Sequence, residues 1–153
     1  MHAADDEIRK FLVPSTKHST AELRDGLTAA LATRSAIKTR TIMIAITLIA
    51  GVNDSLEDAK KLADFVRPML TVAPKIAIDL IPYNDIHVMG FTKPSSDTVN
   101  EFQAVLRREG YFVSVRITRG EEESSACGML STKRKRSPAP DAVSTSLLKH
   151  RVV

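Results

Sequence analysis

Along the chain, the spacing of apolar residues alternates between the pattern typical of helices and the pattern typical of strands. Spacings of three and four residues predict helices over residues 5–11, 20–32, 55–70 and 95–109, with a short one over 122–129. Shorter apolar runs predict strands over residues 41–50, 75–82 and 111–118. Alternation of helix and strand is typical of right-handed βαβ units. The sequence therefore predicts an α/β fold, a parallel sheet with helices outside.

Capping signals mark where these helices begin. Ser19 with Glu22 and Ser55 with Asp58 match the capping box, and Ser95 or Ser96 opens the third long helix. Pro68 is expected to kink or stop the second of these helices. The residues expected to face inward from the three helices are Leu23, Leu27, Ala30 and Leu31; Leu56, Ala59, Leu62, Ala63, Val66 and Leu70; and Val99, Phe102 and Leu106.

The strands differ in how much of each is expected to be buried. The run at residues 41–50 is apolar at both parities, which indicates a central strand buried on both faces. In the last strand Val113, Val115 and Ile117 share one face. Parallel folds bind ligands at the carboxyl ends of strands, here residues 50–54, 82–84 and 118–120. The long connection at residues 83–94 is a further functional candidate.

Charge is divided unevenly between a body, residues 1–130, and a tail, residues 131–153. The net charge of +4 combines −1 on the body with +5 on the tail, so the basic character comes from the tail. We expect this Pro- and Ser-bearing tail to be disordered. Its KRKR run at residues 133–136 is a solvated segment, an RNA-contacting arm or a nuclear import signal. No apolar run reaches the about 18 residues of a membrane span.

Few side chains in the sequence suggest chemistry. Cys127, the single cysteine, excludes an internal disulfide and a self-contained zinc or iron–sulfur site, and it fits a reducing compartment. A lone cysteine is most often a small buried thiol. Asn84 follows a strand, where it either starts an Asx turn or reads an adenine edge. His2 and His87 are expected to be solvated, and Asp79 needs a partner if it is buried.

Four pieces of the chain resemble one family in the same order. They are HAADDEIRKFLVP, GVNDSLEDAKKLADFV, DLIPYN and VRITRGEEESSACGML, together covering about residues 2–130. They are similar to the C-terminal portion of the RlmN/Cfr family of radical-SAM RNA methyltransferases. The resemblance implies an incomplete radical-SAM barrel of the TIM type, an RNA partner (large-subunit rRNA and, for some members, tRNA), no membrane association, and a cytoplasmic location, with an organelle or the nucleus as alternatives.

The resemblance also implies a reaction and its residues. Family members methylate carbon 2 of adenosine with two molecules of S-adenosylmethionine (SAM), a 4Fe–4S cluster and a methyl-carrying cysteine, and a second cysteine resolves the protein–RNA adduct. Cys127 matches the methyl-carrying cysteine. Asn84 and His2 match SAM-contacting residues.

Departures from the family pattern limit these expectations. The CxxxCxxC cluster motif and the resolving cysteine are absent, Ala45 stands where Glu is usual, and Asp79 stands where Asn is usual. The loop after Asn84 lacks the familiar Pro-Phe-Pro-Gly pattern. We therefore expect the chain alone to be a catalytically inert fragment. A non-catalytic RNA-binding module and a degenerate remnant are the alternatives. Open sheet edges predict marginal folding or self-association.

Overall fold

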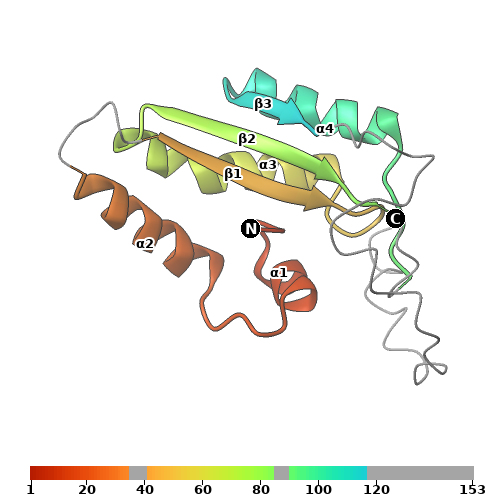
Figure 1. Cartoon of the computed structure of the whole chain (residues 1–153), viewed down its shortest axis with the longest axis horizontal. Helices are drawn as coiled ribbons and strands as arrows, with labels where there is room; N and C mark the ends of the chain where they lie inside the picture. Colours follow the sequence, from red (N-terminus) through yellow and green to blue (C-terminus); the bar gives the residue numbers. More distant parts are fainter. Residues whose placement is uncertain (35–40, 85–89, 117–153) are drawn as a thin grey trace. The chain divides into compact units, whose positions relative to one another are not determined.

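The computed structural model describes residues 1–34, 41–84 and 90–116 (Figure 1). These residues belong to one compact unit, Met1–Arg116. Its elements in order are α1 (Asp6–Leu12), α2 (Thr20–Ala32), β1 (Thr41–Leu48), α3 (Leu56–Val66), the 3₁₀ helix η2 (Arg67–Thr71), β2 (Lys75–Pro82), α4 (Ser96–Arg108) and β3 (Phe112–Val115).

The three strands form one parallel sheet in the order β1-β2-β3 (Figure 1). Ile78 of β2 lies between Ile44 of β1 and Val113 of β3 in the register. The connection from β1 to β2 carries α3, and the connection from β2 to β3 carries α4. This open parallel sheet confirms the predicted α/β fold of an incomplete barrel.

Helix boundaries follow the capping signals. The capping boxes of Ser19 and Ser55 are both formed, and Ser95 accepts a hydrogen bond from the backbone N–H of Thr98 at the start of α4. Pro68 stands in the first turn of η2, so the α-helical hydrogen bonding of α3 ends just before it. Gly110, with φ of +89°, lets the chain reverse from α4 into β3.

One face of the sheet and the helices α3 and α4 enclose the core. Alternate residues of β1 and β2 point into it, and α3 packs directly against α4. The Tyr111 hydroxyl, just before β3, donates to the Ala63 carbonyl of α3 at 2.9 Å. The fully buried side chains of the core include Leu48, Leu62, Val66, Met69, Ile78, Leu80, Phe102 and Leu106.

The opposite face of the sheet is only partly covered, which corrects one prediction. Met43 of β1 is 62% exposed and Phe112 of β3 is 72% exposed. β1 is an edge strand of this sheet, not a central strand buried on both faces. Continuous apolar sequence is expected in any strand of a parallel barrel. It does not show whether a second layer covers both faces in this chain.

Some predicted inward positions on the helices are also wrong. Leu27, Leu56 and Leu70 are 37%, 47% and 42% exposed, and Ala30 is exposed. Leu70 lies in η2, where the tighter 3₁₀ period turns it away from the stripe of α3. Leu56 is the first residue of α3, and Leu31 is the only buried residue of α2. Phe65 and Met69 take inward positions that the periodicity did not predict.

Within the described ranges, no helix is both long and apolar enough to cross a bilayer. The remaining unit, Ile117–Val153, lies outside the described residues. The predicted helix over residues 122–129, the boundary at residue 130 and the basic tail therefore stay predictions.

Candidate functional site at the carboxyl edge of the sheet

The carboxyl ends of β1 and β2 meet at one edge of the sheet. The Tyr83 N–H donates to the Leu48 carbonyl at 2.8 Å, which brings the end of β2 onto the end of β1. The Ala50 N–H donates to the Thr92 carbonyl at 3.0 Å, so the connection after β2 returns to the same place. Asn84 lies half-buried at this edge, directly after Tyr83. The structure thus places Asn84 where the sequence predicted a ligand-binding edge.

His2 reaches the neighbourhood of this edge through its backbone. The Met1 ammonium donates to the Ala45 carbonyl at 3.4 Å, and the His2 carbonyl accepts a 2.6 Å hydrogen bond from the Asn53 side chain. The first residues therefore run beside the outer edge of β1. Desolvation by the neighbouring chain lowers the pKa of the His2 ring, and the terminal ammonium and Arg9 lower it further.

The Asn53 side chain joins the first residues to the turn after β1. This role was not predicted from the sequence. Its Oδ1 accepts from the Ile49 N–H at 2.7 Å, and its Nδ2 donates to the Thr47 carbonyl at 2.8 Å as well as to His2. The side chain is buried, with 3% of the residue exposed. An Asn in a turn after a strand is the signal for such local bonding. The bond to His2 depends on the tertiary fold.

The turn after β1 also holds a partly desolvated carboxylate. Asp54 accepts a hydrogen bond from the Gly51 N–H at 2.9 Å. Burial raises the pKa of Asp54, and the charge of Asp58 adds to this, although the Gly51 hydrogen bond opposes it.

Three aromatic rings link α1 to the same region. Phe11 packs edge-on against Phe91, and Phe91 packs edge-on against Tyr83, with 6.0 Å between ring centroids in each pair. Such T-shaped pairs add to the stabilisation from apolar burial. Phe11 is far from Tyr83 and Phe91 in the sequence, so periodicity could not predict that these rings pack together.

Asp79 has the partners that its burial requires. Its Oδ1 accepts from the Ser114 hydroxyl at 2.9 Å, and its Oδ2 accepts from Arg116 Nε at 2.6 Å. Asp79 is 5% exposed, whereas the Arg116 side chain is 59% exposed. This confirms the expectation that a buried Asp79 is paired.

The remaining predicted residues, Cys127 and His87, lie outside the described residues. Their proposed roles therefore stay predictions. Among the described residues, no group of three or more His, Cys, Asp or Glu side chains could hold a metal. A single cysteine also cannot supply the three thiolates of a CxxxCxxC motif, so this chain does not fit a 4Fe–4S cluster.

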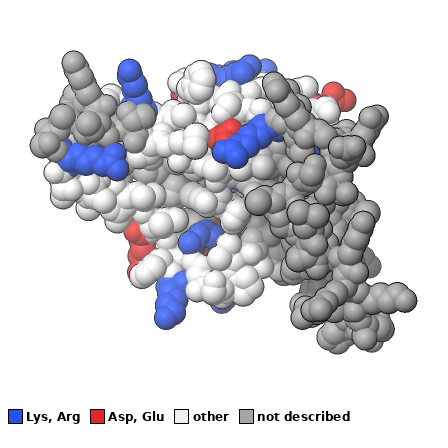
Figure 2. Space-filling model, viewed as in Figure 1, with Lys and Arg blue, Asp and Glu red and all other residues white. Residues whose placement is uncertain are grey.

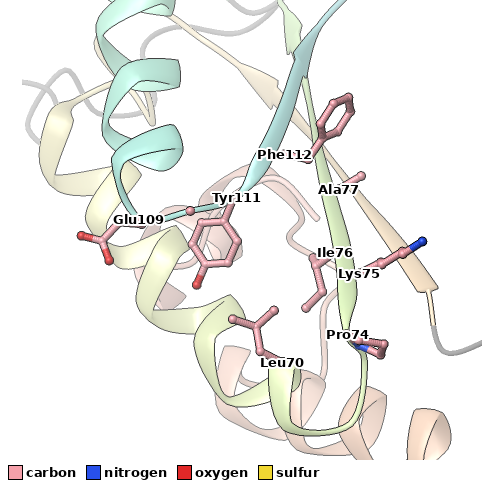
Figure 3. Close-up of a pocket in the computed structure, with 9 residues that line it drawn as sticks. Leu70, Pro74, Lys75, Ile76, Ala77, Glu109, Tyr111 and Phe112 are labelled. Atoms are coloured by element: carbon pink, nitrogen blue, oxygen red, sulfur yellow. The ribbon is translucent and has the colours of Figure 1, made fainter. Parts of the chain in front are cut away.

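A hollow of about 480 Å³ lies at the opposite, amino ends of the strands (Figure 3). Its walls include Lys75 and Ile76 at the start of β2 and Phe112 at the start of β3. In barrels of this kind, the amino end contributes to stability and the carboxyl end carries the chemistry. We therefore do not assign the site to this hollow. On the face shown in Figure 2, described Lys and Arg side chains are scattered, and one of them lies against an Asp or Glu side chain.

Comparison with known proteins identifies the family. No family model matches the chain. A protein named dual-specificity RNA methyltransferase RlmN from Marinomonas sp. (strain MWYL1) is 37% identical over 131 residues, which are 85% of this chain and 33% of that protein. The protein of the same name from Sorangium cellulosum (strain So ce56) is 40% identical over 85% of this chain and 31% of its own length.

Solved structures agree with this comparison. The crystal structure of a radical SAM methyltransferase from Sphaerobacter thermophilus matches 84% of this chain and 35% of its own, with a TM-score of 0.70 and 32% identity. A domain of pyruvate-formate lyase-activating enzyme from Bacteroides vulgatus ATCC 8482 matches 76% of this chain and 63% of its own, with a TM-score of 0.55 at 20% identity, which shows the fold alone. This chain spans about a third of the length of the RlmN relatives. It belongs to the RlmN/Cfr family of radical-SAM RNA methyltransferases and matches their C-terminal portion.

Proposed function

We propose that the chain is the C-terminal part of an enzyme that methylates carbon 2 of adenosine in RNA by radical-SAM chemistry. The observation that carries the proposal is that the chain just before Asn84 and the His2 backbone are both held beside the end of β1, through Tyr83 and through Asn53. These are the two described residues that resemble SAM contacts in the family. The names of the RNA methyltransferase relatives support the substrate class.

Each proposed site residue has a distinct role. The Asn84 amide can donate and accept at once, which suits the polar edge of an adenine ring. The lowered pKa of His2 favours its neutral imidazole, which can accept a hydrogen bond from the cofactor at neutral pH. Cys127 is the proposed methyl carrier, because a thiolate is a strong nucleophile. Bound SAM would supply the methyl group.

The iron–sulfur cluster of the family is not assigned to this chain. Its thiolate ligands are missing from this sequence, so no step of the reaction is assigned to this chain through a cluster. We propose that the isolated chain is catalytically inert. Iron and sulfide analysis of anaerobically purified protein tests this claim. The expected result is the absence of both, and a stoichiometric cluster on this chain would contradict it.

A chimaera tests the function itself. Residues 2–130 would replace the matching segment of a bacterial RlmN relative, and the product would be expressed in cells that lack adenosine C2 methylation. We expect mass spectrometry of RNA nucleosides to show 2-methyladenosine, and the Cys127→Ala chimaera to show none. Methylation that survives Cys127→Ala would contradict the proposed methyl carrier, whereas a folded chimaera without any methylation would contradict the proposed function.

A second candidate function rests on the +5 charge of residues 131–153. In this alternative the chain is a non-catalytic RNA-binding module that contacts phosphates through its tail. Deletion of residues 131–153 should then abolish RNA binding. Binding that survives the deletion would exclude this alternative.

A further inference from the structure

Arg116 is held at one nitrogen, and no described residue engages the end of its guanidinium. Nε donates to Asp79 Oδ2 at 2.6 Å, while Nη1 and Nη2 form no hydrogen bond to the described residues. The backbone N–H of Arg116 donates to the Leu80 carbonyl at 2.8 Å, which anchors the residue at the end of β3. Ser114 supports the same carboxylate from two residues earlier. The guanidinium is therefore oriented by a nearly buried group and not merely solvated.

Arg67 is a surface arginine of the same protein whose two terminal nitrogens are both paired. Its side chain is 57% exposed, close to the 59% of Arg116. Its Nη1 lies 2.8 Å from Asp64 Oδ1, and its Nη2 lies 2.9 Å from Glu109 Oε2. Both terminal nitrogens of Arg67 thus face carboxylates of the protein. At nearly equal exposure, both terminal nitrogens of Arg67 are paired, whereas those of Arg116 form no hydrogen bond to the described residues.

The position of Arg116 places these donors near the candidate site. Phe112 and Ser114 share one face of β3, Arg116 continues this alternation just after the strand, and Asp79 lies opposite Ser114 in the register. This is the sheet face on which Met43 and Phe112 are exposed, and in a closed barrel it points inward. Arg116 is the last described residue before the predicted edge at residues 118–120. A ligand bound at the carboxyl edge could thus reach the terminal guanidinium nitrogens of Arg116.

We propose that Asp79, Ser114 and Arg116 form an oxyanion-binding site, in which Asp79 and Ser114 orient Arg116 and its terminal nitrogens bind a carboxylate or a phosphate. The planar end of a guanidinium matches two oxygens of such a group. In the proposed methyltransferase, the oxyanion is either the carboxylate of SAM or a phosphate of the RNA. That assignment rests on the proposed function, whereas the site itself rests on the geometry.

Titration of the full 153-residue chain with inorganic phosphate tests the site, with NMR detection of the arginine Nε–Hε signals. We expect a saturable shift at Arg116 and no saturable shift at Arg67. Arg116→Gln should weaken phosphate binding by about tenfold or more, and Arg67→Gln should leave it unchanged. Arg116→Lys should give an intermediate loss, because it keeps the charge but not the fork.

Folding must be separated from binding in these variants. Arg116→Gln leaves Asp79 without its cationic partner, so the double variant Asp79→Asn with Arg116→Gln restores neutrality at the buried position. We expect it to be folded and to bind phosphate as weakly as Arg116→Gln. An NMR shift that does not saturate in the wild-type chain would overturn the proposal. So would phosphate binding by the folded double variant that is as tight as that of the wild-type chain.

Two further titrations identify the source of the oxyanion. If it is the SAM carboxylate, decarboxylated SAM should bind about tenfold more weakly than SAM, and Arg116→Gln should remove the difference. If it is an RNA phosphate, a short single-stranded RNA should compete with inorganic phosphate and SAM should not. Saturable phosphate binding without competition from either would uphold the site and contradict its place in the proposed methyltransferase.

Discussion

Ala45 of β1 lies directly opposite Asp79 of β2 in the parallel register. In the sequence they are two separate departures from the family pattern, in which Glu and Asn are usual. In the structure they are neighbours, and Ser114 of β3 continues the row. The carboxylate of this row therefore stands on the middle strand, where Ser114 and Arg116 both reach it.

This relationship predicts that Ala45→Glu destabilises the chain by about 1 kcal/mol, because like charges opposite each other on paired strands repel. Adding Asp79→Asn should recover most of that loss. Urea unfolding, followed by circular dichroism, measures both changes. Met43→Glu is the matched control on the same strand: Met43 is 62% exposed and pairs with Ala77, so it should change stability little. Additive effects of the Ala45 and Asp79 substitutions would contradict the coupling.

Removal of the Asn53 side-chain hydrogen bonds should release the first residues from β1. Asn53→Ala deletes the bonds to Ile49, Thr47 and His2, and we expect a loss of about 1–3 kcal/mol in the free energy of unfolding. The released His2 ring should then titrate closer to its ordinary pKa, since partial burial is the largest cause of its lowering. An NMR titration of the ring detects this. An unchanged pKa for His2 in a folded variant would show that Asn53 does not position it.

Asp5 should make stability depend on pH in the acid range. Although burial alone would raise the pKa of Asp5, hydrogen bonds from Lys61 and from the Ile8 and Glu7 backbone lower it overall. The resulting stabilisation is therefore present above the ordinary pKa of an aspartate and is lost as the pH falls through the lowered value. Unfolding measured from pH 7 to pH 2 should show this loss.

Two substitutions separate the contributions of Asp5. Asp5 caps α1 by accepting from Glu7 and Ile8, and it pairs with Lys61 at 2.9 Å. Asp5→Asn should keep most of the cap and lose the ion pair with its pH dependence. Asp5→Ala should lose about 1 kcal/mol more. If both variants keep the wild-type acid dependence, other carboxylates are responsible for it.

Local features of the fold could be predicted from the sequence because they depend on neighbouring residues. The bounds of α2 and β2 and both capping boxes match the predictions, since a cap and a periodic stripe act within a few residues. The exposed face of β1 could not be predicted, because a continuous apolar run does not show whether another layer of the fold covers each face of the strand. Leu70 was misplaced because a 3₁₀ turn replaces the helical period after Pro68.

The candidate site was predictable only in part, for a similar reason. Asn84 follows β2 as predicted, at the edge where the strand ends of a parallel sheet meet, and its role in binding stays a prediction. The Asn53 bond to His2 and the reach of Arg116 to Asp79 join segments far apart in the sequence. Only the strand register and the path of the first residues bring these groups together, and neither has a local signal. The role of Cys127 stays a prediction.

The proposed function requires the Cys127 thiol to reach the carboxyl edge of the sheet that carries Asn84 and His2. Because Cys127 is the only cysteine in the chain, a nitroxide can be attached to it alone. We predict that the nitroxide broadens the NMR signals of Asn84, His2 and Gly51, relative to the chemically reduced label. Broadening confined to Lys75 and Gly110 at the amino ends of the strands, or no broadening in the sheet, would contradict the claim.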